Sequence, residues 1–325
     1  MVEVTYREAV SRALRESLLE DERVFLMGED IGPYGGAYAV TQGFTEEFGP
    51  RRIKDSPLSE SAFVGSGVGA AMGGLRPIVE IMTINFSLLA MDQIVNNAAK
   101  LRYMSGGQIS VPLIIRTVTG GGAQLGATHS QSLESWYASV PGLRVVVPST
   151  PSDVLGLFRS CRDEKDPTIF VEHTLLYSTK GELCDDDYKV PLGLADVNRE
   201  GSDVTIVSYS RMTHVALTVA DELSREGIEA EVVDLRTLRP LDIDTVVESV
   251  SKTHRAVVVE EGWKTGGIGA EIASQIQYKA FDYMDCPVER VAGAEVPMPY
   301  SKVLEDLAIP GTAQVLAAVR TVLGS

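Results

Sequence analysis

The chain has 325 residues with 29 basic and 45 acidic side chains, which give a formal net charge of −16 at pH 7. This length is enough for two domains that each bury a core, at about 100–200 residues per domain. The excess negative charge repels phosphate backbones and anionic lipids, so we expect no nucleic-acid partner and favour a basic protein surface as a partner. A hydrophobic content of 44% is that of a globular protein and excludes a disordered chain.

The cysteine pattern and the hydropathy pattern indicate the compartment. Cys161, Cys184 and Cys286 lie far apart and form neither a disulfide framework nor a zinc motif, which favours a reducing environment. The longest charge-free apolar stretch, 61–75, is shorter than the roughly 20 residues of a membrane-spanning helix. The first residues do not resemble a secretory signal. We expect a cytoplasmic protein without a membrane segment, or a protein of the mitochondrial matrix or plastid if a transit peptide has been removed.

Strands and helices alternate through the first half of the sequence. Thr5 and Glu8 form a capping box that predicts a helix start, and a buried strand over 23–27 leads to Glu29 and Asp30. Ligands of open α/β sheets bind at the carboxyl ends of strands, which is where these two acids fall. The remaining predicted elements are helices over 65–74, 90–104 and 152–162, and strands over 77–83, 111–116, 144–147 and 168–171.

The helix over 65–74 is rich in glycine, which costs about 1 kcal/mol per residue in a helix interior and indicates that another backbone packs closely against it. A polar stretch over 181–200 then predicts a linker between domains 1–180 and 201–325. Beyond it, strands over 203–209, 230–234 and 256–260 alternate with helices, which predicts a second, mostly parallel sheet. The fold class is therefore α/β in both domains.

Several common catalytic motifs are absent. The sequence has no Gly-Lys dipeptide and hence no phosphate-binding P-loop, and it has no G-x-S-x-G nucleophile elbow. The glycines of 65–74 do not satisfy the strict G-x-G-x-x-G spacing of a dinucleotide site. The four histidines have no metal-ligand spacing, and we interpret His173, His214 and His254 as surface or packing residues.

Two residues stand out as functional candidates. Glu60 lies just before an apolar small-residue helix, where burial would raise the pKa of its carboxyl group towards acid–base chemistry. The alternative, of equal weight, is an acid at a helix N-terminus that is satisfied by backbone amides and the helix dipole. His129 follows the glycine-rich stretch 120–126, and a loop position slightly favours a functional role.

Eight sequence stretches closely resemble one enzyme family, the E1 β subunits of 2-oxoacid dehydrogenases in the transketolase superfamily. The similarity runs in order from about Thr5 to the C-terminus. The stretches over 82–86, 103–107 and 297–300 are most similar to the pyruvate dehydrogenase members, and others are shared with branched-chain 2-oxoacid and acetoin dehydrogenases. The eight stretches are Asp55–Glu60, Glu80–Phe86, Met91–Lys100, Tyr103–Gly107, Thr128–Gln131, Pro141–Leu143, Asp234–Pro240 and Val296–Tyr300.

The resemblance implies a thiamine diphosphate pyrimidine-binding domain followed by a transketolase C-terminal-type α/β domain. It also implies an α2β2 heterotetramer in which the α subunit holds the diphosphate and Mg²⁺ while this chain binds the aminopyrimidine half. This division agrees with the absence of any Gly-Asp dipeptide, because the diphosphate motif of thiamine enzymes begins with G-D-G. The enzyme is then active only with its α subunit.

The resemblance also assigns roles to single residues. Glu60 matches the glutamate that hydrogen-bonds N1′ of the aminopyrimidine, Phe86 matches the aromatic residue that stacks on that ring, and His129 matches the histidine that assists acyl transfer to the lipoyl arm. The family pattern E-x4-G-Φ-x-x-G-Q is met at Glu60, Gly65 and Gly69. It is not met at Ser66 and Ala70.

Further carried-over positions lie near the cofactor or at a cation site. Glu29, Tyr34 and Met82 match residues near the cofactor, with Glu29 in a proton path between paired active sites, whereas Leu89 replaces a polar or acidic residue of some relatives. The resemblance also implies a monovalent-cation site for a potassium ion, built mostly from backbone carbonyls. Its residues here are Leu113, Cys161, Arg162, Glu164 and Asp166.

The function implied is oxidative decarboxylation of pyruvate and reductive acetylation of the lipoyl domain of an E2 acyltransferase. The negative charge of the chain suits docking to a basic peripheral subunit-binding domain on E2. Two alternatives remain: the β subunit of a branched-chain 2-oxoacid or acetoin dehydrogenase, and a non-catalytic scaffold subunit.

Overall fold

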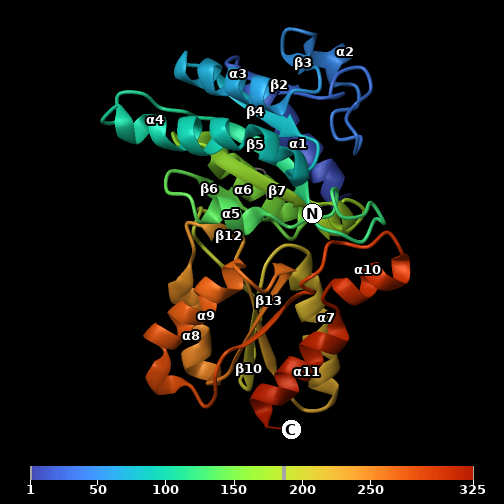
Figure 1. Cartoon of the computed structure of the whole chain (residues 1–325), viewed down its shortest axis with the longest axis vertical. Coiled ribbons are helices and arrows are strands. Elements are labelled where there is room, and N and C mark those ends of the chain that lie inside the picture. Colours follow the sequence, from blue (N-terminus) through green and yellow to red (C-terminus); the bar gives the residue numbers. More distant parts are fainter. Residues whose placement is uncertain (1, 185–187, 325) are drawn as a thin grey trace. The chain divides into compact units, whose positions relative to one another are not determined.

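The computed structural model describes residues 2–184 and 188–324, which form two compact units (Figure 1). The N-terminal unit comprises the chain up to Thr119 together with Trp136–Leu192, and the C-terminal unit comprises Gly120–Ser135 together with the chain from Gly193. The domains expected from the sequence, 1–180 and 201–325, place residues 120–135 in the first domain, whereas the structure places them in the C-terminal unit. The difference concerns the glycine-rich stretch, whose backbone amides bond to side chains of the C-terminal unit.

The stretch predicted as a linker, 181–200, contains two strands. Strand β8 (Lys180–Glu182) pairs antiparallel with β1 (Glu3–Thr5), and β9 (Asp196–Arg199) pairs antiparallel with β11 (Ala230–Asp234). The segment is polar and lacks the hydrophobic alternation of a strand, so it becomes a strand only through backbone pairing with distant residues. Part of the predicted linker, 185–187, lies outside the described residues.

The N-terminal unit contains a parallel sheet in the order β6-β7-β5-β4-β2-β3. The strands predicted from apolar runs are present, with ends shifted by at most three residues, and a further short strand over 53–55 was not predicted. The bounds are β2 (Val24–Gly28), β3 (Ile53–Asp55), β4 (Arg76–Ile81), β5 (Ile114–Thr119), β6 (Arg144–Val146) and β7 (Thr168–His173).

The first helix begins as predicted, since Thr5 accepts a hydrogen bond from the Glu8 amide and donates its own amide to the Glu8 carboxylate at 2.7 Å. The predicted helix over 90–104 is irregular, because its middle segment, η2, is a π-helix. The helices are α1 (Tyr6–Glu20), α2 (Phe44–Phe48), α3 (Glu60–Met72), η1 (Ile84–Ala90), η2 (Gln93–Ala98), α4 (Ala99–Met104), α6 (Pro151–Asp163) and η3 (Thr174–Leu176), with α5 (Glu134–Ala138) shared by the two units.

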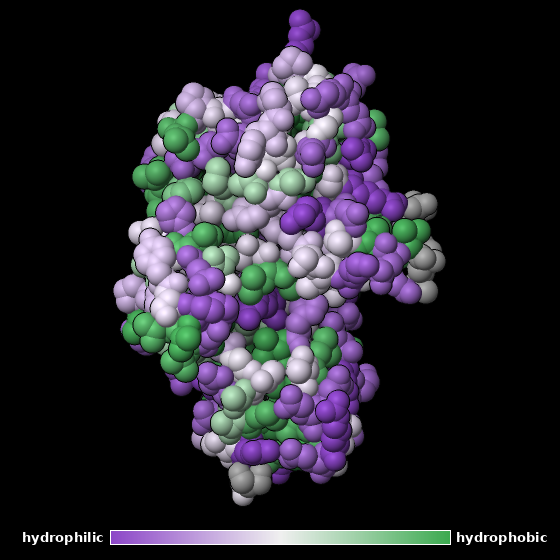
Figure 2. Space-filling model, turned by 90° about the vertical axis from the view of Figure 1, so that its right-hand side faces the viewer, coloured by the Kyte–Doolittle hydropathy of each residue, from purple (hydrophilic) through white to green (hydrophobic). Residues whose placement is uncertain are grey.

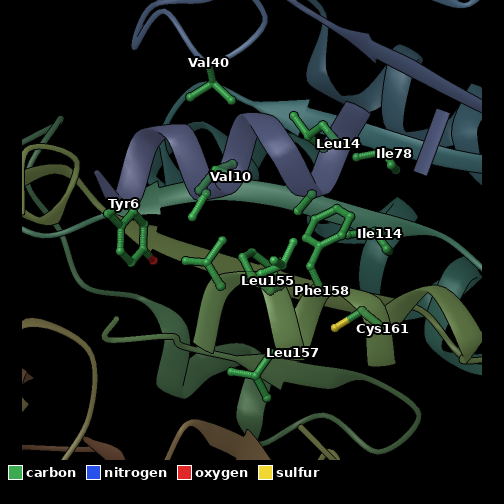
Figure 3. Packing of buried hydrophobic residues seen from close by; sticks show 14 of the residues in the cluster. Tyr6, Val10, Leu14, Val40, Ile78, Ile114, Leu155, Leu157, Phe158 and Cys161 are labelled. Atoms are coloured by element: carbon green, nitrogen blue, oxygen red, sulfur yellow. The ribbon is translucent and has the colours of Figure 1, made fainter. Parts of the chain in front are cut away.

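Helices cover both faces of this sheet. Ile78 of β4 belongs to the cluster of buried side chains formed with α1 and α6, and Figure 3 shows Phe158 of α6 in the space between these two helices. The next residue, Val79, contacts Gly67 of α3. Since successive strand side chains point to opposite faces, α3 covers the face opposite α1. Burial on both faces explains why the strands read as continuous apolar runs.

The C-terminal unit contains a five-stranded sheet in the order β14-β13-β10-β11-β9, parallel except for β9, as the alternating pattern predicted. Helices α7 and α11 pack on one face, and Thr205 on the other face bonds to Ser249 of α8. The further bounds are β10 (Val204–Ser208), β12 (Thr237–Arg239), β13 (Ala256–Trp263), β14 (Glu289–Gly293), α7 (Arg211–Arg225), α8 (Ile243–Thr253), α9 (Ile268–Lys279), η4 (Phe281–Tyr283), α10 (Lys302–Ala308) and α11 (Thr312–Leu323).

Hydrophilic and hydrophobic groups are interspersed over the face drawn in Figure 2. Among the described residues, no helix combines the length and apolar character needed to span a bilayer. The three cysteines are free, with Cys161 buried and Cys184 exposed.

Candidate active site

The carboxyl ends of β2, β3 and β4 lie side by side at one edge of the N-terminal sheet. Gly28, the last residue of β2, is level with Asp55 on β3 and with Glu80 on β4. A Cβ atom at Gly28 would come within 2.7 Å of the Glu80 carbonyl oxygen, so this close approach requires glycine. The segments that follow these strands begin together at the edge where α/β proteins bind ligands.

Glu60 is the first residue of α3, so the helix begins at this residue rather than after it as the sequence suggested. Only 6% of Glu60 is exposed. An acid in the first turn is stabilised by the helix dipole, so the interpretation as a helix N-terminal acid holds as far as position is concerned. That interpretation does not explain the second acid, Glu29, that lies beside it.

Glu29 directly follows β2 and is 5% exposed, and neither of its carboxylate oxygens has a hydrogen-bond partner among the described residues. Burial raises the pKa of Glu29 to about 7, with the negative charges of Glu60 and Asp30 adding to the rise. The backbone N–H of Ser59 offsets part of this shift, although its geometry falls short of a hydrogen bond. Glu29 and Glu60 therefore form a close pair of carboxyl groups, one of which titrates near neutrality.

Tyr34 lies in the loop between β2 and α2 and is 73% exposed. The loop has a defined shape because Asp55 accepts the Gly32 N–H at 2.6 Å and the Asp30 carbonyl accepts the Gly36 N–H at 2.8 Å. Sequence reasoning gave Asp55 no role, although it opens one of the family-like stretches. The structure thus places Tyr34 on a held loop that starts from the same strand end as Glu29.

Met82 and Phe86 follow β4, the strand next to β2, and both are half-buried. Phe86 lies in η1, where its N–H donates to the Thr83 carbonyl at 3.0 Å. An aromatic ring can stack on a planar ligand, and Phe86 lies at the strand end where such a ligand would bind. Leu89 of the same segment is 65% exposed.

His129 belongs to the C-terminal unit, whereas Glu29, Glu60, Met82 and Phe86 belong to the N-terminal unit. Its side chain is exposed, and the Thr128 hydroxyl contacts its Nδ1 atom at 2.8 Å. The backbone N–H of His129 donates to the Gly126 carbonyl at 3.2 Å. An oriented imidazole on a structured loop suits proton transfer near neutral pH.

The other histidines have structural contacts. His173 is buried, and its ring accepts the Leu175 N–H at 3.1 Å. His254 directly follows α8 as its C-cap in a left-handed conformation, and its Nδ1 contacts the Tyr283 carbonyl at 2.8 Å. Both agree with the interpretation as surface or packing residues.

The carbonyls expected to bind a monovalent cation already accept protein donors. Leu113 accepts the Thr168 N–H at 2.9 Å, and Cys161 accepts the Glu164 N–H at 3.2 Å. The expected side chains are engaged as well, because Glu164 and Asp166 form ion pairs with arginines. Among the described residues, no group of three or more His, Cys, Asp and Glu side chains is arranged to hold a metal ion.

The carbonyl of Arg162 accepts a hydrogen bond from the guanidinium of Arg76. Both arginines line a cavity of about 250 Å³ together with Cys161. A fixed positive charge at this carbonyl opposes the binding of a second cation there, so the residues as arranged do not fit a potassium ion.

Sequence reasoning missed a buried charge network in the middle of the N-terminal sheet. Arg116 of β5 makes two hydrogen bonds with Glu172 of β7, at 2.6 and 2.8 Å, and a third with Glu80 of β4. The Tyr177 hydroxyl donates to Glu172 at 2.6 Å. The available signal was a charged residue within or directly after each of three apolar runs, because such charges are rarely buried unless they are paired.

Comparisons with known proteins identify the family. Residues 2–180 match the family model for the transketolase pyrimidine binding domain, and residues 193–315 match that for the transketolase C-terminal domain. The structure is similar to a solved structure described as "Split gene transketolase, inactive beta4 tetramer", with 25% sequence identity and a TM-score of 0.82. The match covers 99% of this chain and 98% of that chain. The expected order of the two domain types is confirmed.

The similar sequences share one description. The chain is 48% identical over 323 residues to the "Pyruvate dehydrogenase E1 component subunit beta" of Rhizobium meliloti, covering 99% of this chain and 70% of that protein. It is 47% identical to the protein of the same name from Rickettsia bellii, covering 99% of each chain. It is 48% identical to the mitochondrial subunit beta-2 of Oryza sativa, covering 98% of this chain and 86% of that one. The chain therefore belongs to the pyruvate dehydrogenase E1 β-subunit family of the transketolase superfamily.

Proposed function

We propose that this chain is the β subunit of a thiamine-diphosphate-dependent E1 that decarboxylates pyruvate and transfers the acetyl group to the lipoyl domain of E2. Nearly full-length similarity to proteins of that name supports this function. The structural observation that carries it is the buried pair Glu29 and Glu60 at the carboxyl edge of the sheet.

The residues at this edge fit the aminopyrimidine half of thiamine diphosphate. The carboxylate oxygens of Glu29 are buried without a hydrogen-bond partner among the described residues, which is the state expected where a polar ligand normally completes the contacts. Thiamine diphosphate, when bound, stabilises a carbanion on the substrate. Glu60 holds and returns one proton at N1′ of the pyrimidine, and Phe86 supports the ring by stacking.

Glu29 and His129 have complementary proton-handling roles in this proposal. Because its pKa is about 7, Glu29 can either hold or release a proton at physiological pH next to Glu60. His129 supplies a proton during acyl transfer to the lipoyl arm, with its ring oriented by Thr128. Tyr34 and Met82 complete the lining of the cofactor site from the loop after β2 and from the end of β4.

The partner is an α subunit that holds the diphosphate and Mg²⁺ in an α2β2 heterotetramer. Exposed apolar side chains of the N-terminal unit support an interface there, among them Leu58, Leu89, Tyr103 and Met104, which are 65% to 89% exposed. The net charge of −16 favours a basic subunit-binding domain on E2. The compartment is the cytoplasm or an organelle matrix, because the relatives include bacterial and mitochondrial proteins.

A potassium ion can bind at the carbonyls of Leu113, Cys161 and Arg162 only if it displaces the Arg76 guanidinium from the Arg162 carbonyl. Exchange of KCl for choline chloride at constant ionic strength tests it. A melting temperature of the enzyme that does not change between the two salts indicates that Arg76 remains at the Arg162 carbonyl. No step of the reaction is assigned to the ion.

A Glu60→Gln variant of the assembled α/β enzyme tests the assignment of the site. It removes the proton acceptor while keeping the shape of the side chain, so we expect assembly to be intact and turnover to fall by at least about 100-fold. Glu22→Gln, at an exposed position near the other end of β2, is the matched control and should retain full activity. A near-normal rate for Glu60→Gln contradicts the assigned role.

Substrate identity requires a separate measurement. Rates with pyruvate, branched-chain 2-oxoacids and acetoin on the same enzyme distinguish the pyruvate assignment from its nearest alternatives. Normal assembly of the E2 complex without any cofactor-dependent turnover would instead favour a scaffold role.

A further inference from the structure

Two buried carboxylates of the C-terminal unit hold the glycine-rich stretch that leads to His129. The Glu261 carboxylate, on β13, accepts the Gly121 N–H at 2.7 Å. The Glu305 carboxylate, on α10, accepts the Gly122 N–H at 2.9 Å and the Gln124 N–H at 3.0 and 3.2 Å to its two oxygens. Glu305 is completely buried, so these amides are the contacts that stabilise its charge.

The backbone of this stretch is shaped to present its N–H groups to the carboxylates. Gly120, Gly122, Gln124 and Gly126 all have positive φ angles, of 92°, 99°, 57° and 75°. Backbone that alternates in this way can direct neighbouring amides to one side, where they form a binding site for an anion. In this protein the anion is the side chain of Glu305, and the loop conformation therefore depends on its charge.

Side chains next to Glu305 pack on the same loop. A Cβ atom at Gly126 would come within 2.4 Å of the Tyr300 ring, and one at Gly121 would come within 2.9 Å of Ile309 and 3.0 Å of Met298. Met298 and Tyr300 belong to the family-like stretch 296–300, to which the sequence assigned no role. The segment 298–309 thus contacts the loop both through a carboxylate and through apolar groups.

We infer that Glu305 is a positioning residue for acyl transfer, which acts by fixing the loop over 120–129 so that His129 is held in its working orientation. This inference rests on the proposed role of His129. Tyr300 contributes by packing against Gly126, three residues before the histidine. Glu261 acts on the same loop but also pairs with Arg211 at 3.2 Å, so Glu305 is the cleaner residue to test.

The test compares Glu305→Gln with wild type in the assembled α/β enzyme. A glutamine can keep its oxygen where Glu305 Oε1 accepts both N–H groups, but its NH₂ group then replaces the oxygen that lies 3.2 Å from the Gln124 N–H. Two donors then oppose each other, and the negative charge that the loop amides surround is lost. We expect hydrogen exchange of the 120–129 peptide to become at least tenfold faster. Glu295→Gln is the matched control, because Glu295 is exposed and accepts the Thr265 N–H at 2.7 Å rather than an amide of this loop.

The activity measurement is the ratio of the rate with the lipoyl domain to the rate with ferricyanide as electron acceptor, both from pyruvate. This ratio should fall at least tenfold in Glu305→Gln and in His129→Ala, and the double variant should fall no further than His129→Ala alone. A purely structural defect would lower both rates together and leave the ratio unchanged, which would overturn the positioning role.

Loop exchange reports on the inference independently of function. If exchange in Glu305→Gln matches that in Glu295→Gln, the inference is overturned whatever the enzyme does. Another outcome is that hydrogen exchange of the loop accelerates in Glu305→Gln while His129→Ala leaves the ratio of the two rates unchanged. In that case Glu305 does fix the loop, but the proposed role of His129 is wrong. Tyr300→Leu is the second variant should Glu305→Gln not fold, because Tyr300 is 71% exposed, and faster loop exchange is again expected.

Discussion

Replacement of Arg116 by methionine should destabilise the N-terminal unit more than most single substitutions. Only 2% of the Arg116 side chain is exposed, and it is bound to Glu172, which is completely buried, and to Glu80. Burial by itself lowers the pKa of Arg116, but the two carboxylates outweigh burial and hold the pKa well above its ordinary value. Burial raises the pKa of Glu80, a shift that Arg116 opposes.

Methionine fills most of the volume but leaves two buried carboxylates without their cation. Removal of one partner from a buried ion pair costs about 3–5 kcal/mol, against a total stability of about 5–15 kcal/mol for a domain. For a unit of this size, each kcal/mol shifts the melting temperature by about 2–4 °C, so a decrease of roughly 10 °C is expected.

Urea unfolding of the purified chain at several pH values measures this cost. In the Arg116→Met variant the buried carboxyl groups bind protons more tightly in the folded chain than in the unfolded one, so stability should fall as pH rises from about 5 to 8. Adding Glu172→Gln should recover at least about 1 kcal/mol, because a neutral amide can still accept the Tyr177 hydroxyl. A loss below 1 kcal/mol, or one that Glu172→Gln does not relieve, refutes the reasoning.

Three other measurements test particular positions. Glu29 has a pKa of about 7 in the folded chain against 4.5 ordinarily, so the folded chain keeps a proton that the unfolded chain loses. Stability should therefore decline as pH rises from 4.5 to 7, by at most about 3 kcal/mol, and urea unfolding of Glu29→Gln should lack this decline. Gly142→Ala places a Cβ atom 2.0 Å from a backbone carbonyl oxygen at φ +99°, so its melting temperature should fall well below that of Gly43→Ala, where φ is +81° and the space is open. Burial raises the pKa of the Cys161 thiol, so iodoacetamide should label exposed Cys184 in the native chain and reach Cys161 only after unfolding.

Local sequence patterns predicted most elements of this fold. The capping box of Thr5 and Glu8 begins α1 as expected, because both partners lie within four residues of each other. Apolar runs such as 111–116 predicted strands because burial on both faces of a parallel sheet removes polar alternation. Strands β8 and β9 were missed, since backbone pairing with distant segments, and not their own pattern, makes them strands.

Some features of the candidate site could likewise be predicted from short sequence stretches, whereas others depend on contacts between distant residues. Glu60, Phe86 and His129 were found from short stretches similar to one family, each readable within a few residues. The sequence did not reveal that burial together with Glu60 raises the pKa of Glu29, or that Arg116 bridges Glu80 and Glu172. Pairs of charges depend on which strands become neighbours.

The glycine-rich stretch over 120–126 shows the limit most directly. Its sequence indicated a loop, and the structure shows that three of its glycines have the positive φ angles that glycine adopts without strain. The partner of that loop, Glu305, lies about 180 residues further along the chain. The sequence by itself therefore determined that this stretch forms a loop. Tertiary packing decided which carboxylate binds the loop amides and hence the position of His129.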